Sequence, residues 1–124
     1  MNKIEVHIDG DGIMHVEYPP HVGVTFDKVR EEYEARLEIT SNKTPLLVKI
    51  HGVAAFDKDA REFLCGAQHS AITSAAAIIS DSRSGYHEYS SMLLELFRGI
   101  NKPPFDCKVF EHEEDALTWL RSYL

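Results

Sequence analysis

The chain has 124 residues, of which 44% are hydrophobic and 27% are charged. This length fits one globular domain spanning residues 1–124, and it exceeds the size at which small cores need disulfide or metal staples. Thirteen Lys and Arg residues against twenty Asp and Glu residues give a formal charge of -7. That charge opposes the phosphate backbone that dominates nucleic-acid affinity, so we expect no nucleic-acid partner.

The cysteines and the N-terminus indicate a reducing, aqueous compartment. Cys65 falls in a predicted helix and Cys107 in a predicted strand, so both are interpreted as buried thiols, with a disulfide between them as the less favoured alternative. The N-terminal sequence MNKIEVHIDG is a strand interrupted by polar residues. No apolar run reaches the roughly 18 residues of a membrane span. We therefore expect a cytoplasmic protein without stable membrane anchoring.

The first 18 residues predict a β-hairpin. Asp9-Gly10-Asp11-Gly12 is strong turn chemistry between two runs in which apolar and polar residues alternate. Both apolar sets lie on one face only if the loop has an odd length of about three or five residues. The apolar positions are Ile4, Val6 and Ile8 in the first run, and Met14, Val16 and Tyr18 in the second.

A helix is predicted after Pro19-Pro20, with Thr25 as its N-cap and Val24 and Val29 as a hydrophobic staple. Charged residues at four-residue spacing predict a solvated face on the side away from the core. The predicted buried stripe is Phe26, Val29, Tyr33 and Leu37, and the predicted solvated pairs are Arg30 with Glu34 and Glu32 with Arg36.

Three further strands and three further helices follow. Leu46–Ile50 is almost continuously apolar, as expected for a central strand covered on both faces. Ala75–Ile79 predicts a strand against which helices pack closely, and Cys107–Phe110 predicts a last short strand. The predicted helices begin at Asp57, at Ser82 or Ser84, and near Glu113. Their inward residues are Ala60, Phe63, Leu64 and Ala67; then Tyr89, Leu93, Leu96, Phe97 and Ile100; then Ala116, Leu117, Leu120 and Leu124.

The predicted order is therefore ββαβαβαβα. Alternation of this kind favours an α/β fold in which an N-terminal β-hairpin leads into a mostly parallel mixed sheet with about four helices.

This order, with KIHGVAAFDKDAREFL at 49–64 and FEHEEDALTWL at 110–120, resembles the SpoIIAA-like group of STAS-type proteins. The family, named for bacterial anti-sigma-factor antagonists, carries a D-S-S-G-L motif whose second serine is a phosphorylation switch. Matched by position, Asp57 is retained, while Lys58, Asp59 and Ala60 replace Ser, Ser and Gly. The resemblance implies a signalling domain, and Asp59 at the switch position implies one without the phosphoserine switch.

The carboxyl ends of parallel strands meet at one edge of a sheet, where ligands bind in open α/β folds. His51 could act there as a base or ligand, with Asp81 orienting it, and Ser82-Arg83-Ser84-Gly85 could bind an anion. The simpler interpretations are an ordinary turn and helix caps, including caps at Asp57 and Asp59. The predicted rim consists of His51, Gly52, Ser80, Asp81, Ser82, Arg83, Glu111 and His112.

No complete catalytic motif is present, and the seven histidines are scattered without metal-ligand spacing. We therefore expect no enzyme activity, no cofactor and no metal. The first hypothesis is a regulatory domain that binds a protein partner through the loop from Gly52 to Asp59 and the helix after it. The alternative is a module that binds a small lipid or anion in the groove at the strand ends. The broad apolar surface of the helix over about 86–99 is first interpreted as core packing, and a homodimer is the second interpretation.

Overall fold

The structure is a computed structural model that describes residues 4–19, 24–50, 58–80 and 104–124. Five strands form one sheet in the order β1-β2-β3-β4-β5. β1 pairs with β2 antiparallel, and the remaining neighbours pair parallel. The strands are β1 (Glu5–Ile8), β2 (Met14–Glu17), β3 (Thr44–Ile50), β4 (Thr73–Ser80) and β5 (Asp106–Phe110).

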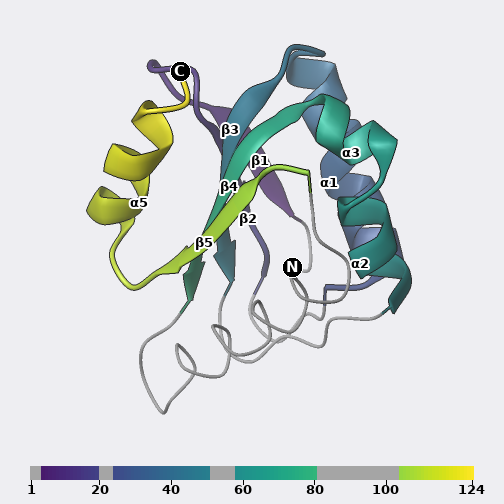
Figure 1. Cartoon of the computed structure of the whole chain (residues 1–124). Helices are drawn as coiled ribbons and strands as arrows, with labels where there is room; N and C mark the ends of the chain where they lie inside the picture. The colour runs from purple at the N-terminus through teal and green to yellow at the C-terminus, as the bar shows by residue number, and fades with distance from the viewer. Residues whose placement is uncertain (1–3, 20–23, 51–57, 81–103) are drawn as a thin grey trace.

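Helices cover both faces of the sheet (Figure 1). One face packs against α1 (Phe26–Ile39), α2 (Lys58–Leu64) and α3 (Ala67–Ala71), and the other face packs against α5 (Glu113–Arg121). β3 lies at the centre and contributes Leu46 to the first core and Leu47 to the second. The prediction of a central strand covered on both faces is confirmed.

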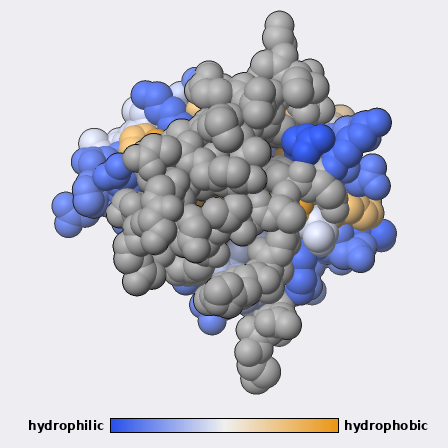
Figure 2. Space-filling view, turned by 90° about the horizontal axis from the view of Figure 1, so that it is seen from below, coloured by the Kyte–Doolittle hydropathy of each residue, from blue (hydrophilic) through white to orange (hydrophobic). Residues whose placement is uncertain are grey.

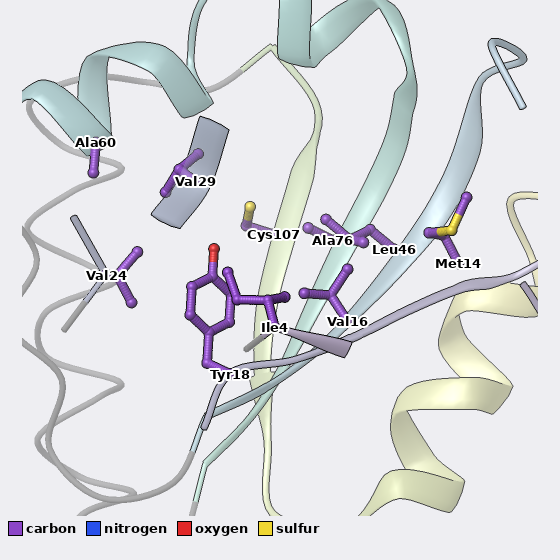
Figure 3. Close-up of a cluster of buried hydrophobic side chains, with 10 residues drawn as sticks. All are labelled: Ile4, Met14, Val16, Tyr18, Val24, Val29, Leu46, Ala60, Ala76 and Cys107. Atoms are coloured by element: carbon purple, nitrogen blue, oxygen red, sulfur yellow. The ribbon is translucent and has the colours of Figure 1, made fainter. Parts of the chain in front are cut away.

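The parallel register aligns rows of side chains across the sheet. Leu46 pairs with Met14 on one side and with Ala76 on the other, and Ala76 pairs in turn with Cys107. These four residues lie side by side on the face that α1 and α2 cover (Figure 3). Val24, Val29 and Ala60 face this row from the helical layer, with the ring of Tyr18 between the layers. Ala76 is 5% exposed, so this row is buried beneath the helical layer.

The hairpin has the predicted register. Ile8 pairs with Met14, and Val6 pairs with Val16, so positions 9–13 form a connection of odd length. Asp9 closes this loop, because its Oδ1 accepts hydrogen bonds from the backbone N–H groups of Asp11 and Ile13. Gly12 adopts a φ of 95°, a backbone conformation that favours glycine over other residues.

α1 buries a different face from the predicted one. Thr25 caps it as expected, since its hydroxyl accepts a hydrogen bond from the N–H of Lys28. Leu37, however, is 39% exposed. Glu32 and Arg36, predicted to lie in solvent, are 1% and 0% exposed. The predicted solvated pair is therefore wrong: both residues follow Val29 on the buried face, at spacings of three and seven.

Two other helices depart from their predicted form. The single helix predicted from Asp57 through Ala67 is divided into α2 and α3 at Gly66. A Cβ at Gly66 would lie 3.3 Å from the carbonyl oxygens of Glu62 and Phe63, so glycine suits this close approach. In α5, Ala116 and Leu120 are buried as predicted, whereas Leu124 is 61% exposed and lies beyond the helix. The helix predicted over about 86–99 lies outside the described residues.

Candidate functional site

The predicted rim is described only in part. His51, Gly52, Asp57, Asp81, Ser82 and Arg83 lie outside the described residues, and so does the proposed contact between His51 and Asp81. The parallel strands β3, β4 and β5 do end at one edge, as the prediction requires. Glu111 and His112 follow β5 there, and both are exposed. Figure 2 views the molecule from this side, and the described residues visible around the grey ones are mainly hydrophilic.

Asp59 is the predicted site residue that the structure describes. It lies exposed in the first turn of α2, where a carboxylate interacts favourably with the helix dipole. This position agrees with the simpler interpretation of Asp59 as a helix-terminus residue. It also leaves the carboxylate accessible from solvent, as a binding surface would require.

Asp59 lines a groove of about 450 Å³ between α1 and the α2–α3 pair. We call this hollow the α2 groove. The aromatic rings of Phe26 and Phe63 meet edge to face, with centroids 5.7 Å apart, and the ring of Tyr33 makes a second edge-to-face contact with Phe63 at 5.4 Å. Edge-to-face contacts of this kind are favourable arrangements of aromatic pairs. The lining residues are Phe26, Asp59, Glu62, Phe63, Gly66, Ala67 and Gln68.

The polar part of the α2 groove is acidic. Asp59 and Glu62 are both exposed and lie in its wall. Lys58 approaches Glu62 with 3.9 Å between Nζ and Oε1, but both side chains are largely exposed. An exposed ion pair of this kind contributes little stabilising free energy in water. The groove therefore combines an aromatic surface with two accessible carboxylates.

A second polar cluster is buried between α1, α3 and the starts of β3 and β4. Arg36 donates from Nη2 to the carbonyl oxygen of Ile72 at 2.7 Å, and from Nη1 to Thr73 Oγ1 at 3.1 Å. Its Nη1 also lies 3.2 Å from His69 Nε2 and 3.8 Å from Glu32 Oε1. The cluster joins three segments that are far apart in the sequence. No sequence pattern predicted that His69 belongs to a buried polar cluster, because its partners come from another helix and from strand termini.

Burial dominates the electrostatics of this cluster. It lowers the pKa of Arg36, although the nearby carboxylate of Glu32 opposes the shift. Burial also raises the pKa of Tyr18 well above its usual value, and the negative charges of Glu32 and Glu31 add to that effect. Three buried atoms of the cluster have no hydrogen-bond partner among the described residues: Glu32 Oε2, Arg36 Nε and His69 Nδ1. Each such atom costs roughly 1 to 3 kcal/mol when nothing replaces its lost hydration.

The cysteines and the metal-ligating residue types form no further site in the described part of the chain. Cys65 and Cys107 form no disulfide with each other, and burial raises the pKa of Cys65. Within residues 4–19, 24–50, 58–80 and 104–124, no three His, Cys, Asp or Glu side chains are arranged to hold a metal ion. None of the helices described there is long and apolar enough to cross a membrane.

An antiparallel hairpin leading into parallel strands, with helices on both faces, defines a mixed α/β protein with a SpoIIAA-like fold. A similar solved structure is the crystal structure of an uncharacterized protein from the DUF3478 family with a SpoIIAA-like fold, from Shewanella loihica PV-4. The TM-score is 0.53 at 18% sequence identity, and the match covers 95% of this chain and 92% of that one. The predicted fold class is thereby confirmed.

The chain belongs to the family defined by the domain of unknown function DUF7793, whose model matches residues 6–124. No curated protein matches it. These comparisons establish family and fold, and the solved relative is itself uncharacterized.

Proposed function

We propose that this protein is a non-enzymatic regulatory domain that binds a protein partner through the α2 groove. The observation that carries the proposal is the combination, in one hollow of about 450 Å³, of an edge-to-face aromatic pair with the carboxylates of Asp59 and Glu62. The resemblance to SpoIIAA-like proteins assigns the signalling surface to the same helix start. Asp59 stands there in place of the phosphorylated serine, so the surface carries a permanent charge instead of a switchable one.

The chemistry of the α2 groove specifies its occupant as a partner segment with a Lys or Arg beside an aromatic or aliphatic side chain. The apolar side chain would cover Phe26 and Phe63, and the cation would lie near Asp59 and Glu62. The formal charge of -7 on the whole chain favours approach of a basic segment from a distance. Because both carboxylates are exposed, they would contribute mainly to the association rate, and the buried apolar contact would contribute most of the affinity.

The test compares Asp59→Lys with Glu114→Lys. Both are exposed acidic residues in the first turn of a helix, so the two variants change the charge equally and lose the same kind of helix-dipole interaction. Glu114 lies on α5, which covers the opposite face of the sheet. Proteins captured from a lysate of the source organism by wild type and by Glu114→Lys, but not by Asp59→Lys, are purified and their binding is measured directly.

We expect a purified partner to bind wild type and Glu114→Lys with similar affinity, and Asp59→Lys about tenfold more weakly or worse. Raising the salt concentration should slow association with wild type. Equal binding of both variants, or equal loss by both, would reject the α2 groove as the partner surface.

The small-ligand alternative concerns the rim where the strands end. Its supporting observation is the parallel arrangement of β3, β4 and β5, which directs their carboxyl ends to one edge. Five of the eight residues predicted for the rim lie outside the described residues, so the rim offers less support than the α2 groove. Native mass spectrometry of the purified protein tests the alternative: a co-purified lipid or anion of defined mass would favour it over partner binding.

A further inference from the structure

The wall of the α2 groove combines two carboxylates and an aromatic ring from one helix. Asp59 and Glu62 are three positions apart on α2, and Asp59 and Phe63 are four positions apart. Residues at these spacings are neighbours on a helix surface, with Cβ atoms roughly 5 to 6 Å apart. Asp59 and Glu62 are exposed, Phe63 is half-buried, and all three line the groove. A group that lies against Phe63 is therefore within reach of both carboxylates.

The second ring of the groove comes from α1 and stands at a right angle to the first. The planes of Phe26 and Phe63 make an angle of 89°. Both rings are half-buried and line the groove, so each leaves part of its surface open to an occupant. A flat group that lies parallel to one of these rings would meet the other ring edge-on. The α2 groove can thus hold a flat group stacked on either ring.

The cationic side chains of arginine and lysine differ in how well they match this surface. The guanidinium of arginine is planar, stacks on aromatic faces, is weakly hydrated and presents five N–H donors in a rigid fork. The ammonium of lysine is a compact and strongly hydrated charge, so it would lose more hydration on lying against a ring. One guanidinium can donate to two carboxylates while its face rests on an aromatic ring.

Lys58 is a cation of the same helix that could occupy one of these carboxylates. Its Nζ lies 3.9 Å from Glu62 Oε1, beyond hydrogen-bond distance, and both side chains are largely exposed. Glu62 can therefore accept a hydrogen bond from a partner. We propose that the α2 groove binds an arginine of the partner segment in preference to a lysine, with the guanidinium stacked on Phe26 or Phe63 and hydrogen-bonded to Asp59 and Glu62. This inference rests on the proposed function and narrows it, from a basic partner segment to one that contains arginine.

The test uses three tripeptides with blocked ends, in which the residue between two leucines is arginine, lysine or symmetric dimethylarginine. Dimethylarginine keeps the charge of arginine but blocks its bidentate hydrogen bonding. The full chain is labelled at its phenylalanine rings. The ring signals of Phe26 and Phe63 report on the groove, and that of Phe110, which packs against the second core, is the control.

We expect the arginine peptide to shift the signals of Phe26 and Phe63 saturably and to leave that of Phe110 unchanged. The lysine and dimethylarginine peptides should each bind about fivefold more weakly or worse. Equal binding of the arginine and lysine peptides would overturn the preference and leave a basic partner segment standing. If no peptide gives saturable shifts, the preference is likewise overturned, and the lysate comparison of Asp59→Lys with Glu114→Lys decides the proposed function separately.

A pair of glutamine variants locates the hydrogen bonds. Glu62→Gln removes a carboxylate from the groove, and Glu34→Gln makes the same change at an exposed residue outside it. The two positions are matched, because Glu34 pairs with Arg30 at the same four-residue spacing at which Glu62 pairs with Lys58. Glu62→Gln should weaken binding of the arginine peptide about threefold or more, whereas Glu34→Gln should leave it unchanged. Equal effects of the two variants would overturn the assignment of the guanidinium to this groove.

Discussion

Arg36 on α1 donates a hydrogen bond of 2.7 Å to the carbonyl oxygen of Ile72, the residue that precedes β4. The same guanidinium reaches Thr73, and through Nη2 it lies 3.5 Å from Thr44 at the start of β3. One buried side chain therefore ties α1 to the amino ends of two central parallel strands. The charge of Arg36 is balanced by Glu32, one helical turn earlier.

Removing this guanidinium should destabilise the fold severely. Arg36→Met leaves the carboxylate of Glu32 buried without its counter-charge, and a loss of roughly 3 to 5 kcal/mol is typical of such a change. Arg30→Met is the control, because Arg30 forms an exposed pair with Glu34 and should cost less than about 1 kcal/mol. Urea unfolding of the two variants measures both costs. Similar losses for the two variants would contradict the burial of Arg36.

Combining Arg36→Met with Glu32→Leu should recover part of the lost stability. The double variant no longer buries an unpaired charge, and apolar replacement of a buried ion pair is often neutral or favourable. We expect it to be more stable than Arg36→Met alone in the same urea titration. A double variant less stable than Arg36→Met would show that Glu32 contributes stability without Arg36, against the structure.

The buried face of α1 can be tested with apolar truncations. Val29→Ala should cost roughly 2 kcal/mol, because Val29 is fully buried against the sheet. Leu37→Ala removes more carbon atoms but should cost less than about 1 kcal/mol, since Leu37 is 39% exposed. Thermal unfolding of both variants gives the comparison. A larger cost for Leu37→Ala would instead support the buried face that apolar spacing alone predicted, in which Leu37 points to the core.

The hairpin loop depends on the backbone of Gly12. With a φ of 95°, Gly12→Ala should destabilise by roughly 1 to 2 kcal/mol. The cause is the backbone, because an added Cβ would meet only ordinary contact, 3.6 Å from Leu124 Cδ2. Gly10→Ala, where a Cβ meets nothing within 4 Å, should stay within about 0.5 kcal/mol. Equal effects at the two positions would exclude backbone strain as the cause.

The stability of the hairpin should depend on pH through the carboxyl group of Asp9. Burial raises the pKa of its carboxyl, but hydrogen bonds from His15 Nε2, at 2.8 Å, and from the N–H groups of Ile13 and Asp11 outweigh burial and lower the net pKa. The folded pKa thus lies below the unfolded value of about 3.9. The stabilisation is present above that unfolded value and is lost as pH falls through the folded pKa.

His15→Phe keeps an aromatic ring but removes the donor to Asp9, so the pKa of Asp9 should rise and acid unfolding should begin at higher pH. His7→Phe is the control. His7 stacks on His15 with centroids 4.7 Å apart, and within the described residues Asp9 pairs with His15 rather than with His7. Carboxyl carbon chemical shifts followed through acid titration report the pKa of Asp9. An unchanged Asp9 titration in His15→Phe would refute this coupling.

Local sequence patterns predicted the sheet more accurately than the helical layer. Alternation around Asp9-Gly10-Asp11-Gly12 specified the hairpin register, because shifting it by one residue would expose the apolar face. The apolar run Leu46–Ile50 specified a central strand, because only double coverage suits consecutive apolar residues. Each of these two signals lies within a single short segment of the sequence.

The errors arose where a residue's environment comes from distant segments. Glu32 and Arg36 share the helical face of Val29, yet their burial depends on His69, Thr73 and the Ile72 carbonyl, which follow Arg36 by 33 to 37 positions. The α2 groove likewise needs Phe26 from α1 to meet Phe63 from α2. The spacing of residues within one helix contains no information about these contacts between distant segments.

The most direct test of partner binding places a photo-crosslinking amino acid at Gln68, an exposed residue of the α2 groove. The matched control carries it at Thr118, an exposed residue of α5 on the opposite side of the sheet. We predict that Gln68 crosslinks to a protein whose attached peptide contains a Lys or Arg beside an apolar residue, and that Asp59→Lys abolishes this product. Crosslinking at Thr118 alone, or a Gln68 product that Asp59→Lys leaves unchanged, would contradict the proposed function.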